Sequence, residues 1–198
     1  MTYDESDDET RDGTYGDPRP YRVCFVCTGN ICRSPMAEAV LRDRLAEDGL
    51  AGLVVADSAG TGGWHEGDGA DPRTVAVLTA AGYGAGRERA HRARQFTADW
   101  FARRDLVIAL DRGHLRELRA MAPSEADAAR VRLLRAYDPE ADGPDVPDPY
   151  YGGPDGFDAC LALVEAAMPG LLAEVGDAVA TGAGPGAGTG PGAGTGAG

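Results

Sequence analysis

Positive charge is scarce in this chain, and the shortage limits what the protein can bind. Its 198 residues include 32 Asp or Glu against 19 Lys or Arg, giving a formal net charge of −13 and a sequence pI near 4.5. Nucleic-acid binding depends on a basic surface that neutralises phosphates. We therefore expect no nucleic-acid partner, and attraction for any anionic ligand must be local to one site.

Other features are missing as well. No apolar run approaches the roughly 20 residues that a membrane helix needs, and the first residues are acidic, unlike the basic and then apolar start of a secretory signal. There are only four cysteines, three of them between residues 24 and 32. In a chain of this size that pattern predicts reduced thiols in a cytosol. We expect no membrane partner and a cytoplasmic location.

The two ends of the chain have the composition of tails. Residues 1–20 contain seven acids and two arginines, together with Pro18 and Pro20, which predicts a disordered acidic segment. Residues 181–198 include glycine at every second position from Gly182 on, which predicts a flexible Gly-rich segment. Residues 21–180 remain as one domain, long enough to bury its own core.

Strand and helix patterns alternate along residues 21–180. Short apolar segments predict strands at 21–26, 53–58, 105–110 and 131–134, and helical spacing predicts helices at 35–48, 72–81, 112–121 and 157–180. A proline at 169 predicts a kink or a break in the last helix, and residues 136–153 predict a long ordered loop. The alternation predicts an α/β single-domain three-layer sandwich with a four-stranded, mainly parallel twisted sheet. Active loops then lie at the carboxyl ends of the strands.

The stretch Val23–Glu38, VCFVCTGNICRSPMAE, joins the first predicted strand to the first helix. Pro35 suits a first helical turn, where its missing N–H has no intrahelical partner. Between a strand end and a helix start, backbone N–H groups converge and the helix dipole favours an anion. The sequence therefore predicts a phosphate-binding loop directly after strand 1.

The residue types in this loop suit one chemistry. A thiolate at Cys27 is stabilised by positive potential, and the planar guanidinium of Arg33 can bind two oxygens of one phosphate. Gly29 permits close approach or a positive φ, Asn30 tolerates a left-handed conformation, and the Ser34 hydroxyl can donate to the sulfur. Together they predict a cradle for a tetrahedral oxyanion above a nucleophile.

The cysteines and histidines also permit other interpretations. Cys24 and Cys27 have a zinc-like spacing, but no second Cys/His pair follows, so we expect no metal. Cys32 either packs beside Cys27 or forms a reversible disulfide with it under oxidation. Cys160 is expected in the core. We expect His65 and His114 to face solvent.

The string CTGNICRSPMAE resembles the low-molecular-weight protein-tyrosine phosphatases. Three further segments resemble that family in order: residues 57–61 (DSAGT), 91–95 (HRARQ) and 148–152 (DPYYG). The resemblance implies a phosphatase that hydrolyses phosphotyrosine and aryl phosphates through a cysteinyl-phosphate, without metal or cofactor. Its implied partners are tyrosine-phosphorylated proteins, and the implied state is a monomer. The richness of the chain in Ala, Gly, Asp and Arg suggests a bacterial source.

The resemblance also implies a role for each matching residue. Cys27 attacks the phosphorus, Arg33 stabilises the transferred group, and Asp148 protonates the leaving oxygen and then activates water. Substrate binding falls to the loop and three aromatic walls of a deep slot: Thr28, Gly29, Asn30, Ile31, Cys32, Ser34, Trp64, Tyr150 and Tyr151. Structural support falls to Ser58, His91 and Asp111, of which Asp111 orients Arg33.

Three other functions remain open at this point. Arsenate reductases share the fold but need resolving cysteines in a mobile segment, and only Cys160 lies far downstream. Related arginine phosphatases tend to carry threonine where this chain has Ile31. A phospho-binding module without catalysis would have no need of a proton donor such as Asp148.

Overall fold

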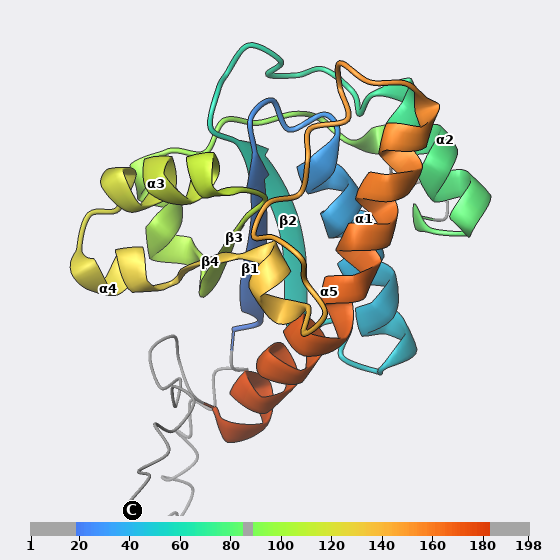
Figure 1. Ribbon diagram of the computed structural model, residues 1–198. Helices are drawn as coiled ribbons and strands as arrows, with labels where there is room; N and C mark the ends of the chain where they lie inside the picture. The colour runs from blue at the N-terminus through green and yellow to red at the C-terminus, as the bar shows by residue number, and fades with distance from the viewer. Residues whose placement is uncertain (1–18, 85–88, 183–198) are drawn as a thin grey trace, which may run out of the picture.

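The computed structural model describes residues 19–84 and 89–182 (Figure 1). The predicted tails at 1–18 and 183–198 lie outside the described residues. Two residues assigned to the acidic tail are described, and one of them contacts the domain. The Arg19 guanidinium donates two hydrogen bonds to the Asp105 carboxylate, at 2.8 and 2.6 Å.

Four parallel strands form one sheet in the order β2-β1-β3-β4. They are β1 (Tyr21–Cys27), β2 (Val54–Gly60), β3 (Leu106–Ala109) and β4 (Val131–Leu133). The central strands β1 and β3 are covered on both faces, which explains why their sequences are continuously apolar. The register pairs Cys27 with Gly60, so β1 and β2 end together.

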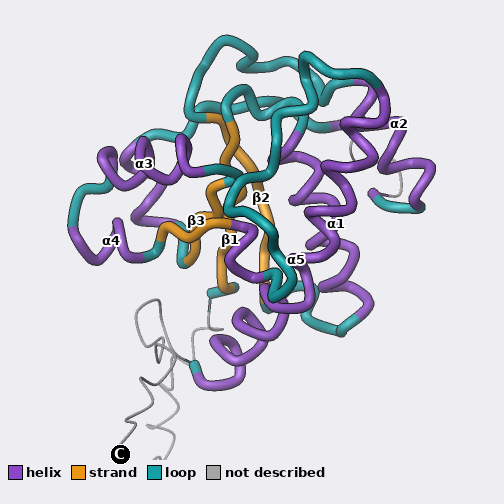
Figure 2. The backbone as a smooth tube through the Cα atoms, in the orientation of Figure 1, coloured by secondary structure: helices purple, strands orange, loops and turns teal. Residues whose placement is uncertain are grey.

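Helices cover both faces of the sheet, as Figures 1 and 2 show. On one side lie α1 (Arg33–Glu47), α2 (Pro72–Ala81) and α5 (Pro154–Thr181); on the other lie the 3-10 helix η2 (Ala98–Arg103), α3 (Arg112–Met121) and α4 (Glu125–Ala129). A short 3-10 helix, η3 (Leu134–Tyr137), leads from β4 into the loop 138–153. Val23 and Phe25 face the first layer, whereas Cys24 and Val26 face the second. The predicted three-layer α/β sandwich is confirmed.

The last helix differs from its prediction. It begins at Pro154 and continues through Pro169 to Thr181 without a break. Met168 and Leu171 are buried on either side of the proline, so core packing holds both halves in one helix despite the missing hydrogen bond. A Cβ at Gly170 would lie 2.3 Å from the Tyr137 carbonyl oxygen, so this glycine lets the η3 backbone pack directly against α5.

Helix α5 also corrects the expectation that no segment reaches membrane-spanning length. Its 28 residues are long and apolar enough, by length and composition, to cross a bilayer. Buried residues recur along it, including Phe157, Val164 and Val175, and they belong to the main core. A core helix that is apolar over most of its surface meets the same criterion.

Candidate active site

The loop between β1 and α1, here called the cysteine loop (residues 27–34), turns sharply at Asn30. Asn30 has φ of 55° and is the only non-glycine residue with positive φ in the described part of the chain. The left-handed position was correctly matched to Asn30, whereas Gly29 does not adopt it. A Cβ at Gly29 would lie 2.9 Å from Cδ2 of His65, so the partly exposed His65 side chain would have to shift.

The backbone N–H groups of the cysteine loop are available to a ligand. Within residues 19–84 and 89–182, no acceptor takes a hydrogen bond from the N–H groups of residues 29–33. Helix α1 begins at Arg33, so the last of these groups belongs to its first turn. Unpaired N–H groups at a helix start form an anion site. This geometry agrees with the predicted oxyanion cradle.

Cys27 is the first residue of this loop and is 3% exposed as a residue. Its Sγ is 3.0 Å from Oγ of Ser34. The same hydroxyl accepts a hydrogen bond from Nδ2 of Asn30 at 2.9 Å and lies 3.2 Å from the carbonyl oxygen of Ala59. A hydroxyl has one proton to donate, so a thiolate at Cys27 would draw that proton away from the Ala59 carbonyl.

Asn30 is held from several directions. Its Nδ2 also donates to Oγ of Ser58 at 2.9 Å, its Oδ1 accepts from the backbone N–H of Arg94 at 2.9 Å, and its carbonyl oxygen lies 2.7 Å from Nε2 of His91. Burial lowers the pKa of His91. Ser58 in turn donates to Glu38 at 2.6 Å. Sequence reasoning placed Ser58 and His91 at the loop but missed Glu38, whose α1 position carried no signal of this contact.

Strand β2 fixes the other side of the loop. The N–H of Thr61 donates to the Cys27 carbonyl at 2.8 Å, and the N–H of Gly62 donates to the Thr28 carbonyl at 2.9 Å. A Cβ at Gly60 would lie 2.6 Å from the Thr28 carbonyl oxygen, which is backbone and cannot swing away. Glycine at position 60 therefore allows β2 to lie directly against the loop.

Arg33 is buried and points to the open end of the cysteine loop. Its Nη1 donates to Asp111 Oδ2 at 2.9 Å and to the Val146 carbonyl at 3.1 Å. Its Nη2 donates to Thr28 Oγ1 at 3.3 Å and to Asp148 Oδ2 at 2.9 Å. Both terminal nitrogens are thus engaged by protein acceptors. Asp111 contacts the arginine as the resemblance implied.

His114 is a site residue that the sequence analysis placed wrongly in solvent. It is buried, with Nε2 2.9 Å from Thr28 Oγ1 and Nδ1 3.0 Å from Asp111 Oδ1. Burial opposes ionisation of Asp111, but the His114 side chain and backbone N–H, followed by the charge of Arg33, lower its pKa well below the usual range. A histidine two positions into α3 gave no sequence signal for this contact, because Thr28 lies 86 residues earlier.

Asp148 reaches the site from the acid loop (residues 138–153). Its side chain is 40% exposed, and Oδ1 accepts from the backbone N–H of Tyr150 at 3.1 Å. Arg73 of α2 anchors the end of this loop. Its Nη1 donates to the Gly152 carbonyl at 3.3 Å, and its guanidinium lies 5.6 Å from the ring centre of Tyr150. Arg73 was another contact that sequence reasoning did not find.

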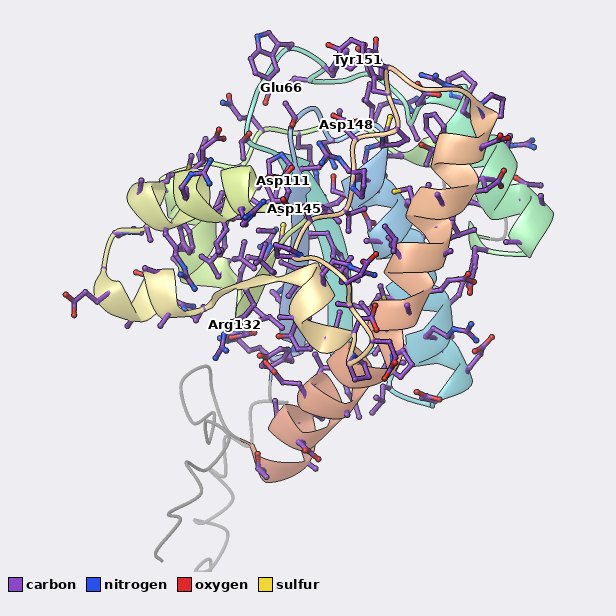
Figure 3. All side chains as sticks on the ribbon, in the orientation of Figure 1. Glu66, Asp111, Arg132, Asp145, Asp148 and Tyr151 are labelled. Atoms are coloured by element: carbon purple, nitrogen blue, oxygen red, sulfur yellow. The ribbon has the colours of Figure 1, made fainter. Side chains whose placement is uncertain are left out.

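A cavity of about 680 Å³ opens beside Arg33. Figure 3 shows Asp111 and Asp148 at the same end of the sheet. The cavity is lined by Thr28, Arg33, Asp111, Arg112, Gly113, Arg116, Asp145, Val146, Pro147 and Asp148.

The predicted aromatic walls do not line this cavity. Tyr150 and Tyr151 pack edge to face with centres 5.0 Å apart, and Tyr151 is 93% exposed. Trp64 is 77% exposed and lies over Gly62. Their contact with a substrate ring stays a prediction.

The remaining thiols differ from Cys27 in their surroundings. All four cysteines are free thiols. Burial, followed by the charge of Asp71, raises the pKa of Cys32 to about 12. Burial also raises the pKa of Cys160 to about 12 and that of Cys24 well above its usual value. Cys27 and Cys32 both belong to the main core cluster, and Cys160 lies in the core as predicted.

The fold and the site together define a class. A parallel α/β sheet presents a cysteine at the end of its first strand, an arginine six positions later at a helix start, and a carboxylate facing that arginine from a distant loop. This is the arrangement of the cysteine-dependent phosphatases. The chain belongs to the low molecular weight phosphotyrosine protein phosphatase family, whose model matches residues 22–181.

Individual relatives agree with the family. The chain is 68% identical over 161 residues to the low molecular weight protein-tyrosine-phosphatase of Streptomyces coelicolor, covering 80% of this chain and 96% of the relative. It is 48% identical over 154 residues to low molecular weight protein-tyrosine phosphatase A of Mycobacterium tuberculosis, covering 77% and 90%. Among solved structures, YfkJ of Bacillus subtilis aligns with a TM-score of 0.75 at 38% identity, covering 82% of this chain and 98% of that chain.

Proposed function

We propose that this protein hydrolyses phosphotyrosine and aryl phosphate monoesters through a cysteinyl-phosphate, with Cys27, Arg33 and Asp148 as its catalytic residues. One observation carries the proposal. Cys27 is buried at the start of a loop whose backbone N–H groups at residues 29–33 have no acceptor within residues 19–84 and 89–182, and Arg33 pairs with Asp148 beside the same loop. A binding module needs the cradle, but it has no need of a carboxylate that faces it.

In the first step, the Cys27 thiolate attacks phosphorus and forms an S–P bond. The P–O bond to the phenol breaks, and the departing oxygen takes the proton of Asp148. Ser34 donates to the sulfur, which stabilises the thiolate before the attack. The loop N–H groups and Arg33 bind the equatorial oxygens, where charge stabilisation does most of the catalytic work in phosphoryl transfer.

In the second step, the S–P bond is hydrolysed. Asp148, now a carboxylate, takes a proton from water as the water oxygen bonds to phosphorus. The S–P bond breaks, its electron pair returns to Cys27, and Ser34 again stabilises the thiolate. Inorganic phosphate then leaves. The positive groups that this reaction needs belong to the chain itself, so we infer that it proceeds without metal or cofactor.

The supporting residues fix the geometry that these steps use. Ser58 and His91 hold Asn30, and Asp111 holds Arg33 by its Nη1. Thr28, Gly29, Ile31 and Cys32 supply the rest of the loop backbone around the phosphate. We infer that Trp64, Tyr150 and Tyr151, all exposed near the loop segments that frame the site, contact the aromatic ring of the substrate.

The substrates that we propose are tyrosine-phosphorylated proteins in the cytoplasm of a bacterium, with the phosphatase acting as a monomer. The bacterial relatives and the four free thiols support this setting. Arsenate reduction is disfavoured because Cys160, the only distant cysteine, is buried in α5 with a raised pKa. Phosphoarginine stays a lesser candidate because Ile31 replaces the threonine expected for it.

A substrate panel tests the proposal directly. Phosphotyrosine, phosphoserine, phosphoarginine and arsenate are compared on the full chain without added metal or thioredoxin, and phosphate release or arsenite formation is measured. We expect turnover of phosphotyrosine far above that of the others. Preferential turnover of phosphoarginine or arsenate would replace the proposed substrate, and turnover of none would leave a binding module.

A further inference from the structure

A second cavity, of about 590 Å³, lies on the other side of the sheet from α1 and α5. We call it the arginine cavity. Its walls include Arg19, Arg22, Arg94, Arg103 and Arg104 around Trp100. Five arginines in one place are notable in a chain whose net charge is −13. Their side chains have no role in the proposed catalytic steps, although the backbone N–H of Arg94 donates to Asn30.

The charges in the arginine cavity do not balance among the described residues. Asp57 pairs with Arg104, and Asp105 pairs with Arg19. Arg103 has only an exposed contact with Asp99 at 3.4 Å. Within residues 19–84 and 89–182, no carboxylate forms an ion pair with Arg22 or Arg94. The cavity therefore carries a local excess of positive charge.

Trp100 organises this wall. The guanidinium carbons of Arg94 and Arg104 lie 5.1 and 4.6 Å from the indole ring centre. The backbone carbonyl of Ser58 accepts from Arg94 at 3.0 Å, which holds that cation from the other side. Cations stacked on an aromatic ring are held in place before a ligand binds. An anion that binds here therefore loses less free energy to the ordering of these arginine side chains.

The chain contains an anionic segment that ends at this cavity. Residues 1–18 carry seven carboxylates and one arginine, for a net charge of −6, and they directly precede Arg19 on the cavity wall. The carboxylates are Asp4, Glu5, Asp7, Asp8, Glu9, Asp12 and Asp17. These residues lie outside the match to the family model, which begins at residue 22.

We propose that the acidic segment 1–18 docks in the arginine cavity of its own chain. Asp12 is seven residues from Arg19, and an extended chain spans about 3.4 Å per residue, so every acid from Asp12 to Asp17 reaches the cavity. The short tether gives the segment an effective concentration in the cavity of the order of millimolar. Soluble anions and other proteins must therefore compete with a tethered segment at this high effective concentration.

The docked segment lies away from the catalytic cysteine. Arg22 is the second residue of β1 and Cys27 is the last, about 17 Å along a strand that rises 3.3 Å per residue. An acidic segment docked at Arg19 and Arg22 therefore neutralises cationic surface at the opposite end of β1 from Cys27. Its occupancy keeps other polyanions from that surface.

The two tryptophans, Trp64 and Trp100, give a direct test by NMR of the full chain. Their indole N–H resonances are assigned with Trp64→Phe. A full-length variant in which all seven acids of residues 1–18 become Asn or Gln removes the proposed interaction without touching the domain. At low salt we expect the Trp100 resonance to differ between the native chain and this variant, and the Trp64 resonance to coincide. Raising the salt to about 0.5 M, where screening acts within about 4 Å, should bring the native Trp100 resonance to the position of the variant.

Variants of the wall separate docking from a general charge effect. Arg22→Gln with Arg103→Gln should lower the salt concentration at which the Trp100 resonance moves. Arg92→Gln, an exposed arginine outside the cavity, should leave it unchanged. Identical Trp100 resonances in the native and neutral-tail chains at low salt would overturn the proposal. Equal salt shifts in both chains would show free anions in the cavity, and loss of the shift on tenfold dilution would show the segment of another copy; either result also overturns it.

Discussion

The carboxylate of Asp148 lies 2.9 Å from Nη2 of Arg33, so the proposed proton donor is hydrogen-bonded to the side chain proposed to bind phosphate. The other terminal nitrogen is occupied by Asp111 and a backbone carbonyl. Thr28 Oγ1 and the Asp148 carboxylate both accept from Nη2, so a phosphate that binds Arg33 through Nη2 competes with them for that nitrogen. Once displaced, Asp148 is free to face the leaving oxygen. We therefore expect phosphate binding at Arg33 to weaken the contact between Arg33 and Asp148.

Asp148→Ala should separate these two roles. Loss of the acid should slow phosphotyrosine hydrolysis by about 10²- to 10⁴-fold, whereas an ester with a good leaving group, such as p-nitrophenyl phosphate, should slow far less. Inorganic phosphate should inhibit the variant at least as strongly as the native chain, because its carboxylate competitor is gone. Steady-state kinetics with both esters and phosphate as inhibitor check this. Equal slowing of the two esters would argue against Asp148 as the acid.

Cys27→Ser should abolish turnover while keeping the cradle. The serine hydroxyl is a far weaker nucleophile than a thiolate, yet the loop N–H groups and Arg33 remain to bind phosphate. Phosphate release should fall to background, and calorimetry should still detect phosphate binding. Cys160→Ser, at a buried thiol outside the cradle, serves as the matched control and should keep its activity. Normal turnover by Cys27→Ser would refute the assignment.

Asn30 combines a strained backbone with three side-chain hydrogen bonds, and two variants divide these contributions. Asn30→Gly and Asn30→Ala both lose the bonds to Ser34, Ser58 and Arg94, so both should lose activity. Only alanine also carries the left-handed strain, about 1 kcal/mol or more. Urea unfolding should therefore show Asn30→Ala less stable than Asn30→Gly by about that amount. Equal stabilities would mean that the loop relaxes to another conformation.

Asp111 should make the stability of the protein depend on acid pH. Its pKa is lowered in the folded state, so its contribution to stability is full above the unfolded value of about 4 and is lost as the pH falls towards the lowered value. Asp111→Asn should be less stable than the native chain at pH 7, and the gap should narrow below about pH 4. Urea midpoints at a series of pH values measure this gap. A gap that stays constant to pH 3 would contradict the predicted linkage.

The thiols should differ in reactivity. Cys32 and Cys160 have pKa values raised to about 12, so both are protonated at neutral pH and unreactive towards iodoacetamide. Cys27 is the proposed nucleophile, and its Sγ lies 3.0 Å from Oγ of Ser34. Mass spectrometry after brief treatment at pH 7 should find one carbamidomethyl group, on Cys27, and inorganic phosphate should protect it. Modification of Cys32 at a comparable rate would show that its surroundings are more polar than the structure indicates.

Sequence alone predicted the parts of this protein that depend on local pattern. The parallel strands followed from apolar segments alternating with helical spacing, and the cysteine loop followed from a strand end, a Pro35 helix start and residue types with known conformational preferences. The left-handed turn fell on Asn30, the non-glycine type that best tolerates it. These signals are local, so no partner elsewhere in the chain was needed to interpret them.

Contacts between distant segments were not accessible in the same way. His114 looked like a solvent histidine because Thr28 approaches it only after β1 and β3 pair. Glu38 and Arg73 received no role from the sequence, although one holds Ser58 and the other anchors the acid loop. Pro169 predicted a weak point in the last helix, but core packing on both sides of it overrides the local preference.

The absence of a side chain at Gly60 has a consequence for motion. Because β2 lies directly against the Thr28 backbone, the start of the cysteine loop is held to the sheet. The opposite side of the site is formed by the acid loop, which contacts Arg73 through Gly152 and Arg33 through Asp148. We therefore expect conformational change during turnover on the side of the acid loop rather than in the cysteine loop.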